Sequence, residues 1–132
     1  WLETRSGDGV MQDWTEYADL ALYGAVNTAN KGDNEAARRL FDDALLLFDG
    51  YGFKDKAHDG RYTTYKLALA LIAAEGVGAE TDARIVSALL AQQGPSGGFF
   101  AHYTVQNDQV TSVGDTNTET TAYALMALAS VR

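Results

Sequence analysis

Apolar and polar positions follow a helical period in five stretches of the chain. These stretches cover residues 13–30, 33–48, 62–75, 80–93 and 117–131. In the second stretch, Ala37, Phe41 and Ala44 form an apolar stripe beside charged residues, as an amphipathic helix requires. Glycines follow the third stretch and Gly94-Pro95 follows the fourth, which are typical helix ends. The pattern predicts an all-α fold with five main helices, and residues 1–3 resemble the tail of a further helix.

The connections between these predicted helices indicate a repeat. Short links at 31–33 and 76–78 predict antiparallel helical hairpins. Longer glycine-rich links are anchored by Gly9, Gly52 and Gly98, which recur about every 45 residues, a spacing typical of helical repeats. A threonine six residues before an Ala-Leu pair recurs after each of these links, at Thr15, Thr64 and Thr121. We therefore expect a single domain over residues 1–132, with about two and a half hairpin repeats at 7–48, 49–93 and 94–132.

Net charge and composition exclude several kinds of function. The net charge of −8 disfavours nucleic acid and anionic membranes as partners, because both select basic surfaces. No apolar run approaches the roughly 20 residues that span a bilayer. The chain has no cysteine, which excludes disulfides, thiol nucleophiles and cysteine-based zinc sites. The two histidines, His58 and His102, are too few for a histidine-rich metal site, so we predict no metal and no cofactor.

Two motifs near the C-terminal end resemble a known superfamily. The run from Gln93 to Phe99, Q-G-P-S-G-G-F, is similar to the Q-x-x-x-G-x-W turn of the prenyltransferase and squalene-cyclase repeat proteins. Residues 117–125, N-T-E-T-T-A-Y-A-L, resemble the start of an inner helix in that superfamily. The likeness is strongest over 89–128 and weak before Asp49. It implies part of an α/α toroid, about half a ring, and therefore either self-association or a missing half supplied by other sequence or by a partner.

The catalytic residues of that superfamily do not carry over. Thr120 stands where the protonating cyclases have their acidic Asp, and a threonine is no acid at useful pH. Asn117 and Glu119 stand where the protein prenyltransferases have the Asp and Cys that bind zinc. The resemblance thus implies the scaffold without the known chemistry, and no catalytic residue is predicted.

Aromatic and polar side chains gather before the first, third and fifth predicted helices. In a toroid they would converge on one mouth of the central cavity, where such a mixture suits a small molecule, a sugar or a peptide. The candidate ligand-binding residues are Trp14, Tyr17, Arg61, Tyr62, Tyr65, His102, Tyr103, Glu119 and Tyr123.

Structural roles are the alternative for the same positions. Asp13, Asp59, Asp115 and Asn117 are preferred helix-capping types, and aromatic residues also build cores. Residues 104–114 form an insertion relative to the preceding repeat, which predicts either a functional loop or a tolerated surface loop.

The leading hypothesis is a non-catalytic α/α-toroid repeat module that binds a ligand or a partner chain, with a secreted or surface protein as its setting. One alternative is a fragment of a cyclase-like, prenyltransferase-like or sugar-active α/α-barrel enzyme whose catalytic residues lie partly in other sequence. Another is a structural spacer.

Overall fold

The computed structural model describes residues 11–131 of the chain. Within them it contains five α-helices, one short 3-10 helix and three strands. In chain order these are η1 (Trp14–Glu16), α1 (Ala18–Asn30), α2 (Asn34–Leu45), β1 (Tyr62–Thr63), α3 (Thr64–Gly76), α4 (Ala83–Leu90), β2 (Phe99–Gln106), β3 (Gln109–Asn117) and α5 (Thr118–Ser130). Each α-helix lies within or close to one of the five stretches predicted from periodicity. The predicted helix tail at 1–3 and the first glycine-rich link at Gly9 lie outside the described residues.

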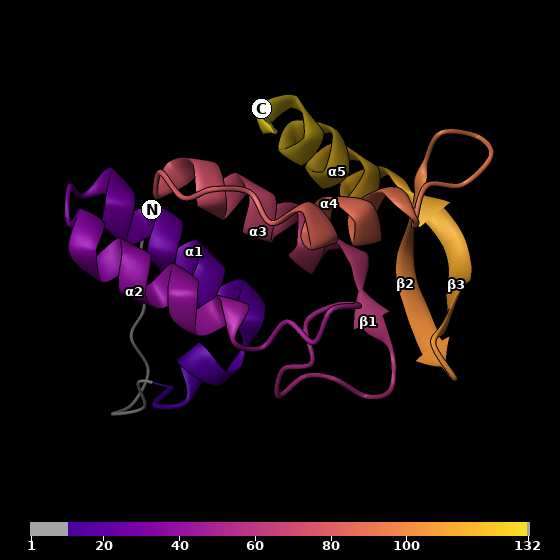
Figure 1. The fold of residues 1–132 in the computed structure, drawn as a ribbon, viewed down its shortest axis with the longest axis horizontal. Coiled ribbons are helices and arrows are strands. Elements are labelled where there is room, and N and C mark those ends of the chain that lie inside the picture. The colour runs from indigo at the N-terminus through magenta and orange to yellow at the C-terminus, as the bar shows by residue number, and fades with distance from the viewer. Residues whose placement is uncertain (1–10, 132) are drawn as a thin grey trace, which may run out of the picture.

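Helix α3 is the centre of the fold. It packs against α1 on one side and α5 on the other, and it also contacts α4 and β2. From Thr64 to Ala74 every residue except Tyr65 and Ile72 is buried. A helix that is apolar around nearly its whole circumference has to be covered on all sides, which places α3 in the core. Figure 1 shows α1 and α2 together at one end of the molecule and the strands at the other.

Side-chain caps fix the starts of three helices. Asp33, Asp82 and Asn117 accept a hydrogen bond from a backbone N–H in the first turn of α2, α4 and α5 respectively. The capping role predicted for Asn117 is therefore confirmed. Asp13 precedes η1 but makes no side-chain cap hydrogen bond, and Asp59 lies in the loop before β1.

The predicted all-α fold class is wrong, because the chain forms a three-stranded antiparallel sheet in the order β1-β2-β3. The described structure is 51% helical and 18% strand. The insertion at 104–114 is the outer part of the β2–β3 hairpin, in which Val105 pairs with Val110 across the turn. Asn107 and Asp108 form this turn with positive φ angles of 50° and 61°, as a two-residue hairpin turn of the primed type requires. β-Branched residues on both sides of this turn favour strands over a helix.

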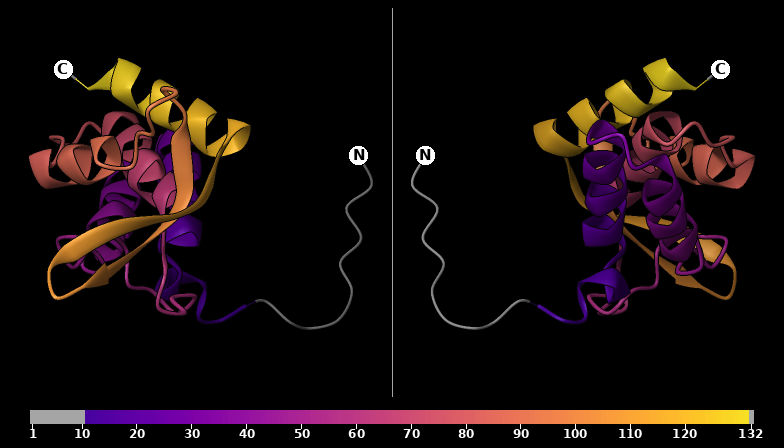
Figure 2. Two further views of the ribbon diagram at one scale, coloured as in Figure 1. Left: turned by 90° about the vertical axis from the view of Figure 1, so that its right-hand side faces the viewer. Right: turned by 90° about the vertical axis from the view of Figure 1, so that its left-hand side faces the viewer.

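The predicted partial α/α toroid is wrong for the same reason. Residues 99–117 are extended and pack on α3 and α5, so this part of the chain does not continue a succession of helices. The views of Figure 2 show the hairpin as a long ribbon beside the helices rather than a further helical layer. The expectation that a half ring would self-associate loses its basis with the ring.

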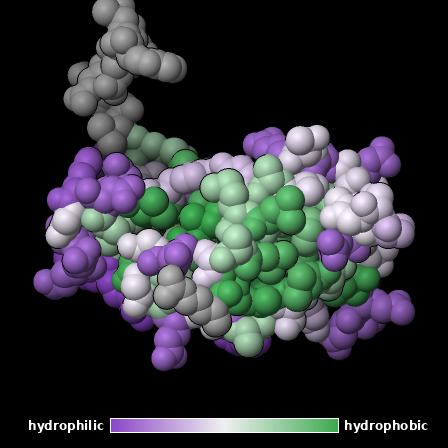
Figure 3. Space-filling model, turned by 90° about the horizontal axis from the view of Figure 1, so that it is seen from above, coloured by the Kyte–Doolittle hydropathy of each residue, from purple (hydrophilic) through white to green (hydrophobic). Residues whose placement is uncertain are grey.

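Apolar surface is nevertheless exposed on the side of α5. Leu125 and Met126, both on α5, are 59% and 62% exposed. Figure 3 views the molecule from this side and shows a broad apolar area.

Within residues 11–131, the longest and most apolar helices still fall short of what a membrane crossing would need.

Candidate functional site

The N-terminal ends of α1, α3 and α5 bring three tyrosines and two carboxylates together. Two of these side chains belong to α1, one to α3 and two to α5. We call this set the tyrosine–carboxylate cluster; it comprises Asp19, Tyr23, Tyr65, Glu119 and Tyr123. The three helices start side by side because α3 packs between α1 and α5.

A buried ion pair connects two of the helices that carry the cluster. The Nζ atom of Lys66, on α3, lies 2.5 Å from Oδ2 of Asp55, and both side chains are almost fully buried. The same Oδ2 atom accepts a hydrogen bond from the N–H of Ala18 at 2.8 Å, and Oδ1 accepts one from Ala57 at 3.1 Å. Asp55 therefore joins the start of α1 to α3. A buried charge pair is tolerated when its remaining hydrogen-bonding capacity is used, as it is here.

Asp19 links the Lys66–Asp55 ion pair to the tyrosines. Its carboxylate accepts the hydroxyl hydrogen of Tyr65 and the backbone N–H of Leu20, and Oδ1 lies 4.0 Å from Nζ of Lys66. Burial and the neighbouring Asp19 carboxylate raise the pKa of Tyr65. At neutral pH the Tyr65 hydroxyl is consequently protonated, and it donates a hydrogen bond rather than acting as a base.

The outer part of the cluster is a pair of tyrosine hydroxyls. The Oη atoms of Tyr23 and Tyr123 lie 2.7 Å apart, and the ring centroids of Tyr123 and Tyr65 lie 6.0 Å apart. Burial, the bond to Tyr123 and the charges of Asp19 and Glu119 raise the pKa of Tyr23 to about 12. Tyr23 and Glu119 are exposed, so a ligand in solution can reach this end of the cluster.

The structure divides the nine candidate residues of the sequence analysis. Tyr65, Glu119 and Tyr123 belong to the cluster. Tyr62 and Tyr103 instead stack on each other across β1 and β2, with ring centroids 5.3 Å apart.

The remaining four candidates lie elsewhere. Trp14 lies against Gly24 of α1, and η1 contacts both α1 and α2. Tyr17 precedes α1 and is half-buried, without a place in the cluster's hydrogen bonds. Arg61 pairs with Asp59 at 2.7 Å in the loop before β1. His102 lies in β2 opposite Thr63.

Sequence reasoning missed four residues that build the site. Asp19 and Tyr23 lie within the first predicted helical stretch but outside its apolar face, and Asp55 lies in a loop. Lys66 carries the one recognisable signal, since a lysine directly before the apolar run 67–74 has to be paired once the helix is buried. Within residues 11–131, no group of three or more His, Cys, Asp or Glu side chains is placed to hold a metal ion.

The chain gives no match to a family model, and searches of curated proteins and of solved structures find no significant similarity. The resemblance to the prenyltransferase and squalene-cyclase superfamily therefore stays a prediction. What the site does has to be inferred from its own chemistry.

Proposed function

We propose that this chain is a non-catalytic binding module and that the tyrosine–carboxylate cluster binds a carbohydrate. The observation that carries the proposal is the convergence of three tyrosines and two carboxylates from three helices, with a hydroxyl pair and a free carboxylate at the exposed end.

A polyhydroxylated ligand matches the mixture of groups in the cluster. Sugar hydroxyls both donate and accept hydrogen bonds, and tyrosine hydroxyls do the same. The Glu119 carboxylate is an acceptor with no hydrogen-bond partner among the described residues. Tyrosine rings add apolar faces with a polar tip, which suits the alternation of C–H and O–H groups on a sugar ring.

The protonation and the hydrogen bonds of the same groups favour binding over catalysis. The raised pKa of Tyr65 keeps its hydroxyl protonated, so it cannot abstract a proton at neutral pH. The Asp19 carboxylate is held by Tyr65 and by the N–H of Leu20, and it is therefore a positioning group rather than a free nucleophile. The Lys66 ammonium is engaged by Asp55 and buried.

A binding screen with two variants tests the proposal. We expect at least one of a panel of neutral hexasaccharides built from glucose, xylose or N-acetylglucosamine to bind, measured by saturation-transfer NMR and calorimetry. Tyr23→Phe and Tyr123→Phe each remove one hydroxyl, and each should weaken binding by about 3- to 10-fold, the effect of one hydrogen bond. Tyr51→Phe is the matched control, because it also removes one hydrogen-bonded tyrosine hydroxyl, the one that donates to Asp108, on a different part of the fold.

Two outcomes would contradict the proposal. Saccharide affinity that is the same in all three variants would mean that sugars bind elsewhere. Binding of lysine-rich peptides or of choline at the cluster, with no saccharide binding, would replace the carbohydrate by a cationic ligand, for which the acidic residues and aromatic rings would be the recognition elements.

A further inference from the structure

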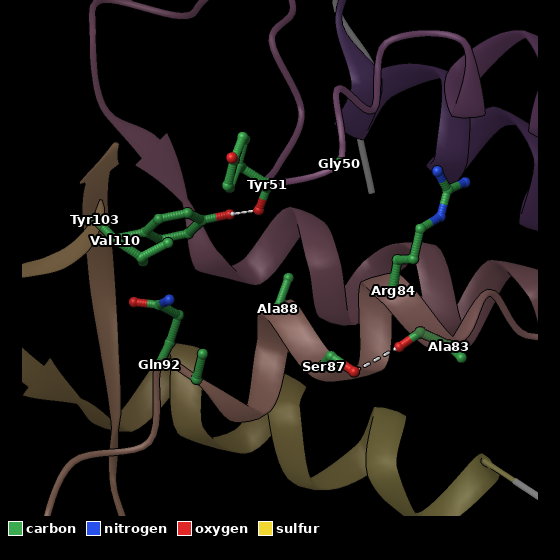
Figure 4. Close-up of a pocket in the computed structure, with 10 residues that line it drawn as sticks. Gly50, Tyr51, Ala83, Arg84, Ser87, Ala88, Gln92, Tyr103 and Val110 are labelled. Atoms are coloured by element: carbon green, nitrogen blue, oxygen red, sulfur yellow. Dashed lines mark hydrogen bonds between the residues drawn. The ribbon is translucent and has the colours of Figure 1, made fainter. Parts of the chain in front are cut away.

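A separate cavity lies between α4, the loop at Gly50 and the β2–β3 hairpin. Its volume is about 440 Å³, within the range of small-molecule binding sites. Its walls are mainly apolar, and Figure 4 shows the side chains around it. The residues that matter here are Tyr51, Ser87, Ala88, Gln92, Tyr103 and Val110. None of them belongs to the tyrosine–carboxylate cluster.

Gln92 provides an unpaired hydrogen-bond donor at this cavity. The residue is 1% exposed, and its Oε1 atom accepts a hydrogen bond from the hydroxyl of Ser112 on β3 at 3.1 Å. Its backbone carbonyl accepts from the N–H of Phe100 at 3.0 Å, which holds the residue in place. Because the oxygen side of the amide is taken, the Nε2 side faces the cavity, as Figure 4 shows. Nε2 has no hydrogen-bond partner among the described residues and is not fully enclosed by them, so it is open to a ligand in the cavity.

The other polar groups of the wall are already satisfied. The hydroxyl of Tyr103 donates to the carbonyl of Tyr51 at 2.7 Å, and the hydroxyl of Ser87 donates to the carbonyl of Ala83 at 2.9 Å. The Tyr51 hydroxyl donates to Asp108 at the hairpin turn. A ligand in this cavity therefore meets apolar surface with one unused donor, Nε2 of Gln92.

We propose that this cavity is a second binding site, for a small aromatic ketone or amide whose carbonyl oxygen accepts a hydrogen bond from Nε2 of Gln92. The cavity is flanked by the rings of Tyr51 and Tyr103, which offer faces for an aromatic body, and Ala88 leaves room beside α4. A neutral carbonyl fits better than a carboxylate, because the guanidinium of Arg84 at the rim is already paired with Asp82 at 2.7 Å and the chain carries a net charge of −8.

A pair of nearly isosteric probes isolates the hydrogen bond. Acetophenone and ethylbenzene share a ring and a two-carbon side chain, but only acetophenone has an acceptor. In titrations of the full ¹⁵N-labelled chain followed by amide chemical shifts, both should give saturable shifts at residues around the cavity. Acetophenone should bind roughly tenfold more tightly, since ethylbenzene leaves the amide unpaired.

Gln92→Glu is the matched variant. It keeps the shape and the oxygen that Ser112 contacts, and it replaces the free N–H₂ donor by an acceptor. The preference for acetophenone should disappear in this variant, while ethylbenzene binding should change much less. Ala88→Leu fills the cavity and should abolish binding of both probes without lowering the melting temperature, which keeps the test decisive if Gln92→Glu folds poorly.

Three results would overturn the inference. They are equal affinity of the two probes in the unaltered chain, an acetophenone preference that survives Gln92→Glu, and probe binding that survives Ala88→Leu. Because Tyr23→Phe leaves the cavity untouched, it should not change acetophenone binding. The aromatic site and the proposed carbohydrate site can thus fail independently.

Discussion

The ammonium of Lys66 and the carboxylate of Asp55 form an ion pair whose side chains are only 6% and 1% exposed. The pair joins the loop before β1 to the middle helix of the fold, and the same carboxylate receives the first N–H of α1. Tyr65 and Asp19 directly follow the two helix starts that the pair connects. The pair therefore connects the starts of α1 and α3 next to the residues that form the Asp19–Tyr65 hydrogen bond.

Asp55→Ala should lower the free energy of unfolding by about 3–5 kcal/mol, because it leaves the buried Lys66 charge with only the Asp19 carboxylate, at 4.0 Å, as a counter-charge. It also removes the acceptor for the N–H of Ala18. Urea denaturation measures the change. Asp42→Ala is the control, since it breaks the exposed pair with Arg38 and should cost no more than about 0.5 kcal/mol. Equal effects of the two substitutions would show that the buried pair has no special role.

The titration of Tyr23 should depend on its hydroxyl contact with Tyr123. The raised pKa of Tyr23 means that the folded chain holds this phenolic proton more tightly than the unfolded chain. The associated stability is fully present below pH 10 and is lost as the pH rises from 10 to about 12. Tyr123→Phe removes the hydroxyl partner, so the pKa of Tyr23 should fall toward 10, as measured by tyrosinate absorbance. An unchanged pKa of Tyr23 in this variant would mean that the hydroxyl contact does not persist in solution.

The hairpin turn should be sensitive to the shape of its first residue. Asn107→Val places a β-branched side chain at a φ of 50° and should cost about 1–3 kcal/mol, whereas Asn107→Gly should be neutral or slightly stabilising. Gln106→Val, one residue earlier in β2, is the control and should have little effect, because β-branched residues suit an extended backbone. Thermal melts of the three variants test the prediction, and equal costs at both positions would contradict it.

The helices were predictable because their signals are local. Apolar spacing and a capping residue such as Asn117 depend on a few neighbouring positions, and helix α5 begins where those signals place it. The hairpin was missed although its signals were also local. Asn107 and Asp108 between Val105 and Val110 form a recognisable two-residue turn, but in the expected helical repeat this segment has the place of an insertion. The expected helical repeat and the local turn pattern thus gave opposite predictions for this segment, and the turn pattern was right.

The site was harder to predict than the helices, because its contacts are distant in sequence. Tyr23 and Tyr123 are 100 residues apart, and Asp19 and Tyr65 are 46 apart. Their meeting depends on how α1, α3 and α5 pack, which periodicity does not specify. The aromatic positions Tyr65 and Tyr123 could be identified as candidates from their place at helix starts. Their separation from Tyr62 and Tyr103 follows from the strand pairing that the sequence analysis had not foreseen.

The stacked rings of Tyr62 and Tyr103 make Gly52 the most constrained glycine of the described chain. A Cβ atom at this position would fall within 2.5 Å of Cδ1 of Tyr62 and even closer to the Tyr103 hydroxyl. Both neighbours are buried, and their side chains are held by bonds to Asp49 and to the Tyr51 carbonyl, so they have little freedom to move away.

Gly52→Ala should therefore lower the free energy of unfolding by about 1–3 kcal/mol, the usual cost of forcing extra volume into a packed core. Gly76→Ala is the matched control. It lies in the last position of α3, where a Cβ would meet only an ordinary contact with Val26 at 3.8 Å, and alanine favours a helix. It should be neutral or stabilising. Urea denaturation of both variants decides the point, since a Gly52→Ala protein as stable as the parent would require the Tyr62–Tyr103 stack to be looser than the structure shows.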